Sequence, residues 1–195
     1  MKLFRKLFKQ TFIYGLATVL PRMLSFLLLP LYSSVMPPGL YGEVSLVFVW
    51  FAIFNVILAY GMETAFFRFY TREPDQEQVH STSLIAIGAS TLVFLGTFLL
   101  FRNSLSVLLN IDPRYMGYFI GILCLDALVI IPFARLRAME RPAVYAIVKI
   151  ANICVNLGFN LFFLLLLPKL AAGEKGVWHA LYRPDFQVSY ILISN

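Results

Sequence analysis

The sequence predicts an all-α membrane protein in which several transmembrane helices form a polytopic bundle. Of its 195 residues 60% are hydrophobic and only 13% are charged, and the mean hydropathy is +0.80. Soluble domains average about 25% charged residues, and a soluble core of this length could not bury so much apolar side chain. A bilayer can accommodate it, because one helical span needs about 20 mostly apolar residues. Several such stretches follow one another along this chain.

The first predicted span covers residues 10–35 and follows a basic segment at residues 1–9. An apolar stretch of this length exceeds the about 7–15 residues of a signal-peptide core, so we expect an uncleaved helix. The span should end at Pro37 and Pro38, since paired prolines cannot continue a helix.

Further apolar segments predict four more spans and the beginning of another. Short polar segments with turn-forming residues separate them, including a connector at 102–114. We expect Pro168 to end the fifth span, because proline disrupts a helix interior. The spans are 41–69, 81–101, 115–133 and 144–167, and an incomplete one begins at 186–195.

The positive charges predict a cytoplasmic N-terminus. Spans alternate in direction, so the flanking Lys and Arg residues divide into two sets, and with the N-terminus inside nine are cytoplasmic and five are external. Cytoplasmic loops of membrane proteins carry the excess of Lys and Arg. The nine are Lys2, Arg5, Lys6, Lys9, Arg68, Arg72, Arg135, Arg137 and Arg141.

Other function classes find little support in the residue pattern. The net charge of +6 is scattered between apolar runs, which disfavours a nucleic-acid partner. Cys124 and Cys154 lack the spacing of a metal site or a disulfide framework. His80 and His179 lie in separate polar segments, and no catalytic motif occurs. We therefore expect no enzyme activity, metal or cofactor.

Arg22 is the most informative residue, because it falls near the middle of the first span. A charged side chain there costs about 2.5–3.5 kcal/mol on insertion scales, so something must compensate it. Two interpretations remain open. Arg22 pairs with Asp126 of the fourth span, or it faces a substrate cavity. Helical spacing places Arg22 on one face with a polar stripe of Thr11, Gly15, Thr18 and Ser25.

Two other spans carry polar side chains. In the fifth span, Lys149, Asn152, Asn156 and Asn160 recur at spacings of three and four and therefore share a helix face. The asparagines either hydrogen-bond between helices or line a wet path. In the second span, Asn55 is central, and we expect Glu63 near the inner end to form a local ion pair with Arg68.

Four runs of the sequence carry a family resemblance. GLATVLPR (15–22), FLLLPLY (26–32), PPGLYG (37–42) and YGMETAFFR (60–68) together resemble the N-terminal region of bacterial polysaccharide biosynthesis proteins. These are the Wzx-type flippases of O-antigen and capsule biosynthesis in the MOP superfamily, which also contains the MATE exporters.

The resemblance implies the N-terminal lobe of a two-lobed inner-membrane transporter that moves a polyprenyl-pyrophosphate-linked oligosaccharide by alternating access. The second lobe would then be missing, either truncated in cis or supplied in trans. The alternative function is a MATE-like ion-coupled exporter of small molecules. The second alternative is a membrane glycosyltransferase or polymerase of the same pathway. The expected partners are the lipid-linked oligosaccharide and membrane lipids. The candidate cavity residues are Arg22, Lys149, Asn152, Asn156, Asp126 and Asn55.

Overall fold

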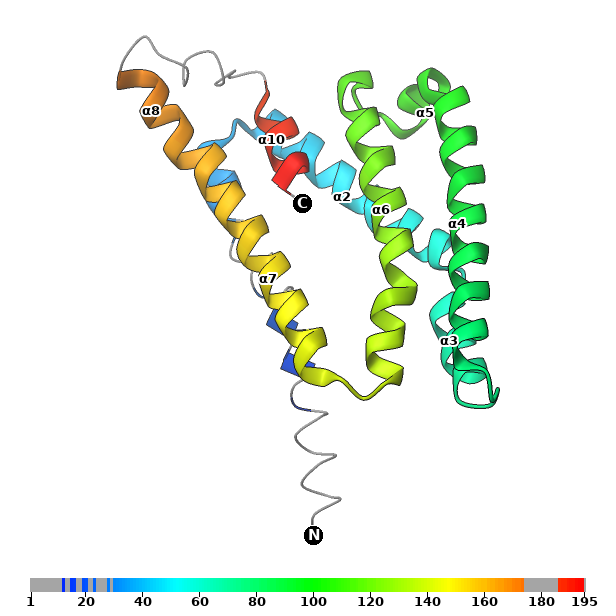
Figure 1. The fold of residues 1–195 in the computed structure, drawn as a ribbon. Helices are drawn as coiled ribbons and strands as arrows, with labels where there is room; N and C mark the ends of the chain where they lie inside the picture. Colours follow the sequence, from blue (N-terminus) through cyan, green and yellow to red (C-terminus); the bar gives the residue numbers. More distant parts are fainter. Residues whose placement is uncertain are drawn as a thin grey trace. The chain divides into compact units, whose positions relative to one another are not determined.

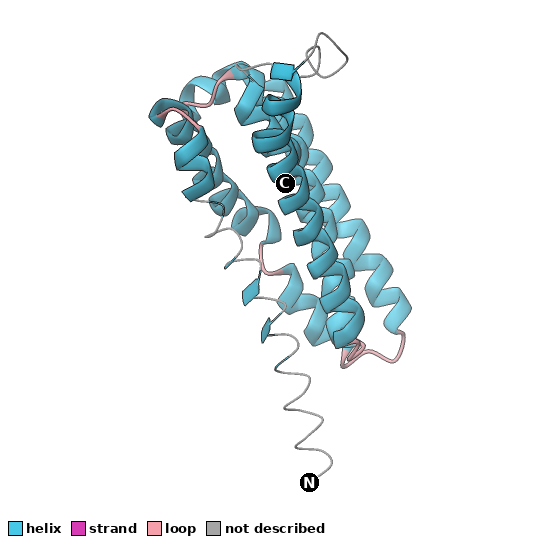
Figure 2. Ribbon diagram, turned by 90° about the vertical axis from the view of Figure 1, so that its left-hand side faces the viewer, coloured by secondary structure: helices cyan, strands magenta, loops and turns pink. Residues whose placement is uncertain are grey.

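A computed structural model describes residues 30–173 and 186–194, together with a few single positions between 12 and 28. Its regular structure within these residues is entirely helical, which confirms the predicted all-α class (Figures 1 and 2). Four helical segments there are long and apolar enough to cross a membrane: 38–70, 76–100, 113–138 and 142–170. Half of the first predicted span, including Arg22, lies outside the described residues.

The chain divides into two compact units. Unit 1 comprises Met1–Val44 and Pro142–Asn195, and unit 2 comprises Ser45–Arg141. The helices are α2 (Pro38–Ala59), α3 (Met62–Tyr70), α4 (Gln76–Leu100), α5 (Arg102–Leu109), α6 (Pro113–Ala138), α7 (Pro142–Leu161), the π-helix η1 (Phe162–Leu166), α8 (Leu167–Gly173) and α10 (Gln187–Ser194). The boundary at residue 44 falls inside α2, so this helix contributes to both units.

Unit 2 is built around α6, which packs against α3, α4 and α5 (Figure 1). α6 begins at an Asp112 N-cap, whose side chain accepts from the backbone N–H of Arg114, and it has Pro113 in its first turn, where a missing N–H costs nothing. The core between α3, α4 and α6 consists of Phe66, Tyr70, Ile87, Ile131 and Ala134.

The second predicted span is not one helix, because the chain breaks between α2 and α3. Tyr60 has φ 27° and Gly61 has φ 75°, both in the left-handed region. Glycine adopts that region without steric cost, whereas a residue with a Cβ is disfavoured there. Helical periodicity continues across the break, so the apolar pattern alone could not reveal it.

The connector expected at 102–114 contains the short helix α5. This helix ends at Asn110, which is left-handed with φ 54°. The hydroxyl of Ser106 then donates to the carbonyl of Ile111 over 2.6 Å, and the indole N–H of Trp50 donates to the carbonyl of Leu109 over 3.0 Å. Side-chain donors thus satisfy the carbonyl of Leu109 at the end of α5 and that of Ile111 just beyond it.

Unit 1 contains the helical segment 30–35, the start of α2, and the helices α7, η1, α8 and α10. The chain breaks at Pro37, as the paired prolines predicted. The prediction that Pro168 ends the fifth span is wrong, because α8 continues through it to Gly173. The π-helix directly before Pro168 explains this, since a local π adjustment can satisfy backbone groups that a proline leaves unpaired.

α10 lies where the incomplete sixth span was predicted, and it packs against α7 and η1. The rings of Phe163 and Tyr190 stack with centroids 5.0 Å apart and an interplanar angle of 6°. Six of the eight residues of α10 are buried, so this short helix belongs to the core of unit 1.

Candidate functional site

Asn55 of α2 and Asp126 of α6 meet at the middle of unit 2. The amide Nδ2 of Asn55 donates to the carboxylate Oδ2 of Asp126 over 3.0 Å. Asn55 is the eighteenth of 33 residues in its span, and Asp126 is the fourteenth of 26 in α6. At about 1.5 Å per residue, Asp126 lies about 18 Å or more from either end of its helix. Two of the sequence-predicted candidates therefore form one pair at mid-membrane depth.

The seam between α2 and α6 holds this pair in place. Phe51 precedes Asn55 by four residues and Phe119 precedes Asp126 by seven, so each phenylalanine shares a helix face with its polar partner. The two rings lie 4.9 Å apart between centroids, about one helical turn from Asn55 along α2 and about two turns from Asp126 along α6. Phe54 adds edge contacts to Phe119 at 5.9 Å and to Phe98 of α4 at 5.2 Å. Aromatic side-chain contacts beside the pair thus link the two helices that carry it.

The environment of the pair is apolar, yet Asp126 is exposed and Asn55 is half-buried. The neighbouring Leu125 is 64% exposed and Val129 is 41% exposed. Placing an ionised carboxylate at the centre of a span costs about 2.5–3.5 kcal/mol on insertion scales, and the amide of Asn55 offsets part of that cost. Ionisable groups at such positions usually face a bundle interior or a water-filled cavity, which makes Asp126 a functional candidate.

A second group of charges lies at one end of unit 2. Its pairing shows that the ion pair predicted from the sequence was wrong. Glu63 of α3 pairs with Arg137 of α6 and not with Arg68. The guanidinium of Arg137 also lies over the ring of Phe67, 5.5 Å from its centroid. Local spacing favoured Arg68, but α3 packs along α6, and this contact brings the distant arginine closer.

Sequence reasoning also missed the ion pair of Arg135 with Glu77 of α4, which measures 2.6 Å. The alternating direction of the spans could have indicated that these charged residues lie close together. The second and fourth spans run in the same direction, so they end at the same membrane surface. Glu63 and Arg137 then fall near the same membrane surface. The two pairs join α3, α4 and α6 around the core of Phe66 and Tyr70.

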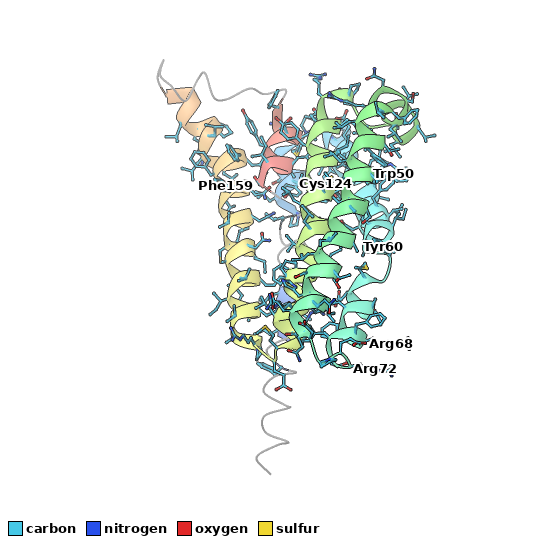
Figure 3. All side chains as sticks on the ribbon, turned by 45° about the vertical axis from the view of Figure 1, so that its right-hand side comes forward. Trp50, Tyr60, Arg68, Arg72, Cys124 and Phe159 are labelled. Carbon is cyan, nitrogen blue, oxygen red and sulfur yellow. The ribbon has the colours of Figure 1, made fainter. Side chains whose placement is uncertain are left out.

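The cations of unit 2 are distributed unevenly between its ends. Five of the seven lie at the end where α3 and α6 finish, and two lie at the opposite end near α5. Figure 3 labels Arg68 and Arg72 at the first end and Trp50 toward the other. The five are Arg68, Arg72, Arg135, Arg137 and Arg141, and the two are Arg102 and Arg114.

The polar stripe of α7 divides into residues with different surroundings. Asn160 is buried with 1% exposure, accepts from the hydroxyl of Tyr32 over 2.8 Å, and donates to Asn156 Oδ1 over 3.1 Å. Its amide also donates to the Asn156 carbonyl over 2.9 Å. Asn160 therefore hydrogen-bonds between helices of unit 1. Asn152 is exposed, and Lys149 and Asn156 are half-buried.

Four helices of membrane-spanning length, with an amide–carboxylate pair at mid-depth, define a multi-pass membrane protein. Among the residues that the structure describes, no group of three or more His, Cys, Asp or Glu side chains could hold a metal ion. Residues 7–182 match the family described as polysaccharide biosynthesis protein, and the chain belongs to this family. No curated protein and no solved structure gives a significant match.

Proposed function

We propose that this chain takes part in moving a polyprenyl-pyrophosphate-linked oligosaccharide across the bacterial inner membrane, as a Wzx-type flippase of the MOP superfamily. The observation that carries the proposal is the Asn55–Asp126 pair at mid-membrane depth, in a chain that belongs to a polysaccharide biosynthesis family. Polar groups at the midplane are typical of substrate sites in transporters that work by alternating access.

The cargo has two chemical parts, and the candidate residues suit both. Arg22 and Lys149 are cations in apolar segments, and a guanidinium presents a bidentate fork that matches a phosphate group. Asn152 and Asn156 provide amides along the face of α7 that carries Lys149. In this proposal Arg22 faces the substrate cavity and binds the pyrophosphate of the carrier.

The distribution of charge in unit 2 supports the proposed orientation. In this proposal the end with five cations faces the cytoplasm and the end with two faces outside, and the N-terminus of the chain is cytoplasmic. We propose transport rather than an enzymatic reaction, because the mid-depth polar side chains of unit 2 lie in the seam between helices and not on a loop.

A MATE-like exporter driven by an ion gradient is the second candidate function. The observation that favours it is Asp126, since exporters of small cations would use an acid at mid-depth. The two functions differ in what accumulates when the protein is absent. Loss of a flippase blocks surface polysaccharide and leaves the lipid-linked oligosaccharide on the cytoplasmic side, whereas loss of an exporter leaves the polysaccharide unchanged.

The test is to delete the gene in its native host and to complement it with the wild-type protein or with variants. We expect deletion to abolish surface polysaccharide. Arg22→Ala should restore less of it than Arg22→Lys at equal membrane abundance, because lysine keeps the charge without the fork. Arg72→Ala, which removes an exposed cation from a loop end, is the matched control and should restore it fully. Normal polysaccharide after deletion would exclude the flippase.

A further inference from the structure

The short helix α5 presents apolar side chains on its outward face. Val107 is 83% exposed and Leu108 is 76% exposed, and Leu100 at the end of α4 is exposed as well. The opposite face of α5 packs on unit 2, where Ser106 and Leu109 are buried. Large apolar side chains that gather on one surface indicate an interaction site, so the outward face of α5 is a candidate for one.

The depth of α5 in the membrane follows from the two helices that it joins (Figure 1). The mostly apolar runs 84–101 and 115–133 are about 27 Å and about 28 Å long, and each nearly fills a hydrocarbon core of about 30 Å. Arg102 and Arg114, next to these runs, therefore mark the boundary of the core. The guanidinium of Arg102 also donates to the carbonyl of Pro113 over 2.7 Å, which holds both ends of the connector together. α5 thus begins at the edge of the hydrocarbon.

A hydrogen bond to α2 places the C-terminal turn of α5 deeper than its start. The indole N–H of Trp50 donates to the carbonyl of Leu109, the last residue of α5. Trp50 lies nine residues beyond Tyr41, where the second predicted span starts, which is about 13 Å along α2. A tilt of α2 shortens this depth without cancelling it. Val107 and Leu108 belong to the same turn of α5, so their exposed side chains lie at the level of the acyl chains.

We propose that α5 is an interfacial helix whose partner is the bilayer surface at the end where α4 finishes. Val107 and Leu108 insert among the upper acyl chains, and the guanidinium of Arg102 lies at the level of the lipid phosphates. The surface is continuous with the end of α4, where Leu99 and Leu100 are exposed. By binding there, α5 sets the depth of α4 and α6 in the membrane. The inference requires only that the chain crosses a membrane, so it stands even if the proposed transport fails.

The experiment uses the complete protein, purified and reconstituted into vesicles of phosphatidylethanolamine and phosphatidylglycerol. Val107→Cys and Leu108→Cys are made singly in a cysteine-free background, and each cysteine carries a nitroxide spin label. Power-saturation EPR then measures how often the label collides with oxygen, which concentrates among acyl chains, and with a water-soluble nickel chelate. Leu92→Cys, at an exposed position within α4, is the lipid reference, and Pro74→Cys, at an exposed position between α3 and α4, is the water reference. Ser104→Cys is the matched control, because Ser104 precedes Leu108 by one turn on the same face of α5.

We expect the labels at positions 107 and 108 to collide mainly with oxygen. Their ratio of oxygen to nickel collisions should be close to that of the label at position 92 and well above that at position 74. The label at position 104 should give a lower ratio than the label at position 108, because the first turn of α5 lies nearer to water. The melting temperature of each unlabelled variant should equal that of the cysteine-free protein, since the substituted side chains are exposed.

Three results would overturn the inference. Collisions mainly with the nickel chelate at positions 107 and 108 would place α5 in water, above the membrane. Few collisions with either reagent would show that a protein segment covers this face instead of lipid. A higher ratio at position 104 than at position 108 would reverse the inclination of α5 on which the inference depends. None of these results bears on what the protein transports, so the proposed function is tested separately.

Discussion

Removing Arg137 tests the ion pair that the structure forms in place of the one predicted from local spacing. Its side chain is 31% exposed and that of Glu63 is 41% exposed, so the pair is half-buried. Exposed pairs contribute about 0–1 kcal/mol, and breaking a buried pair costs about 3–5 kcal/mol. The contact with Phe67 adds about 0.5–1 kcal/mol. We therefore expect Arg137→Ala to lower the free energy of unfolding by about 2 kcal/mol.

The assay is reversible unfolding in mixed detergent micelles, followed by the fluorescence of Trp50, which lies in the same unit. Arg68→Ala is the control, since Arg68 is exposed, and it should change stability by less than about 0.5 kcal/mol. A double-mutant cycle of Glu63→Gln with Arg137→Met should give a coupling of about 1 kcal/mol. The reasoning is refuted if that coupling is absent, or if Glu63 couples to Arg68 instead.

Three further predictions concern the backbone, the packing of unit 1 and the topology. Gly61→Ala should destabilise by about 1 kcal/mol because its φ is 75°. Gly96→Ala, near the C-terminal end of α4 with open space around it, should not; thermal shifts in detergent measure both. Tyr32→Phe should cost about 1 kcal/mol in the same assay, since Asn160 loses its buried donor. In a cysteine-free background, Ser104→Cys should react with an impermeant thiol reagent added outside intact cells, and Pro74→Cys should not.

For each of these three predictions, one result would contradict the structural argument behind it. Equal effects of the two glycine substitutions would show that the left-handed turn is not strained by a side chain. An unchanged stability of Tyr32→Phe would mean that the hydroxyl is equally well solvated when the protein unfolds. Labelling of residue 74 from outside would reverse the proposed orientation of the chain.

Composition and periodicity predicted the helices well, because each span must satisfy its own backbone within the bilayer. The apolar runs therefore mark the helices of both units, and Pro37 marks a true break. The same patterns failed at Gly61 and at Pro168. An apolar run continues through a left-handed turn, and a π-helix lets a helix pass a proline that would otherwise end it.

In the candidate site too, the sequence identified some features and the tertiary structure decided others. Sequence alone identified Asn55 and Asp126 as polar residues at mid-depth, because charge and amide groups are costly in hydrocarbon wherever they occur. Only the tertiary structure decided that they meet, and that Glu63 meets Arg137. Pairing between helices depends on which faces pack together, and each helix can turn about its own axis without changing its sequence pattern. The sequence thus determined the helices and the depth of their polar groups, and packing determined their partners.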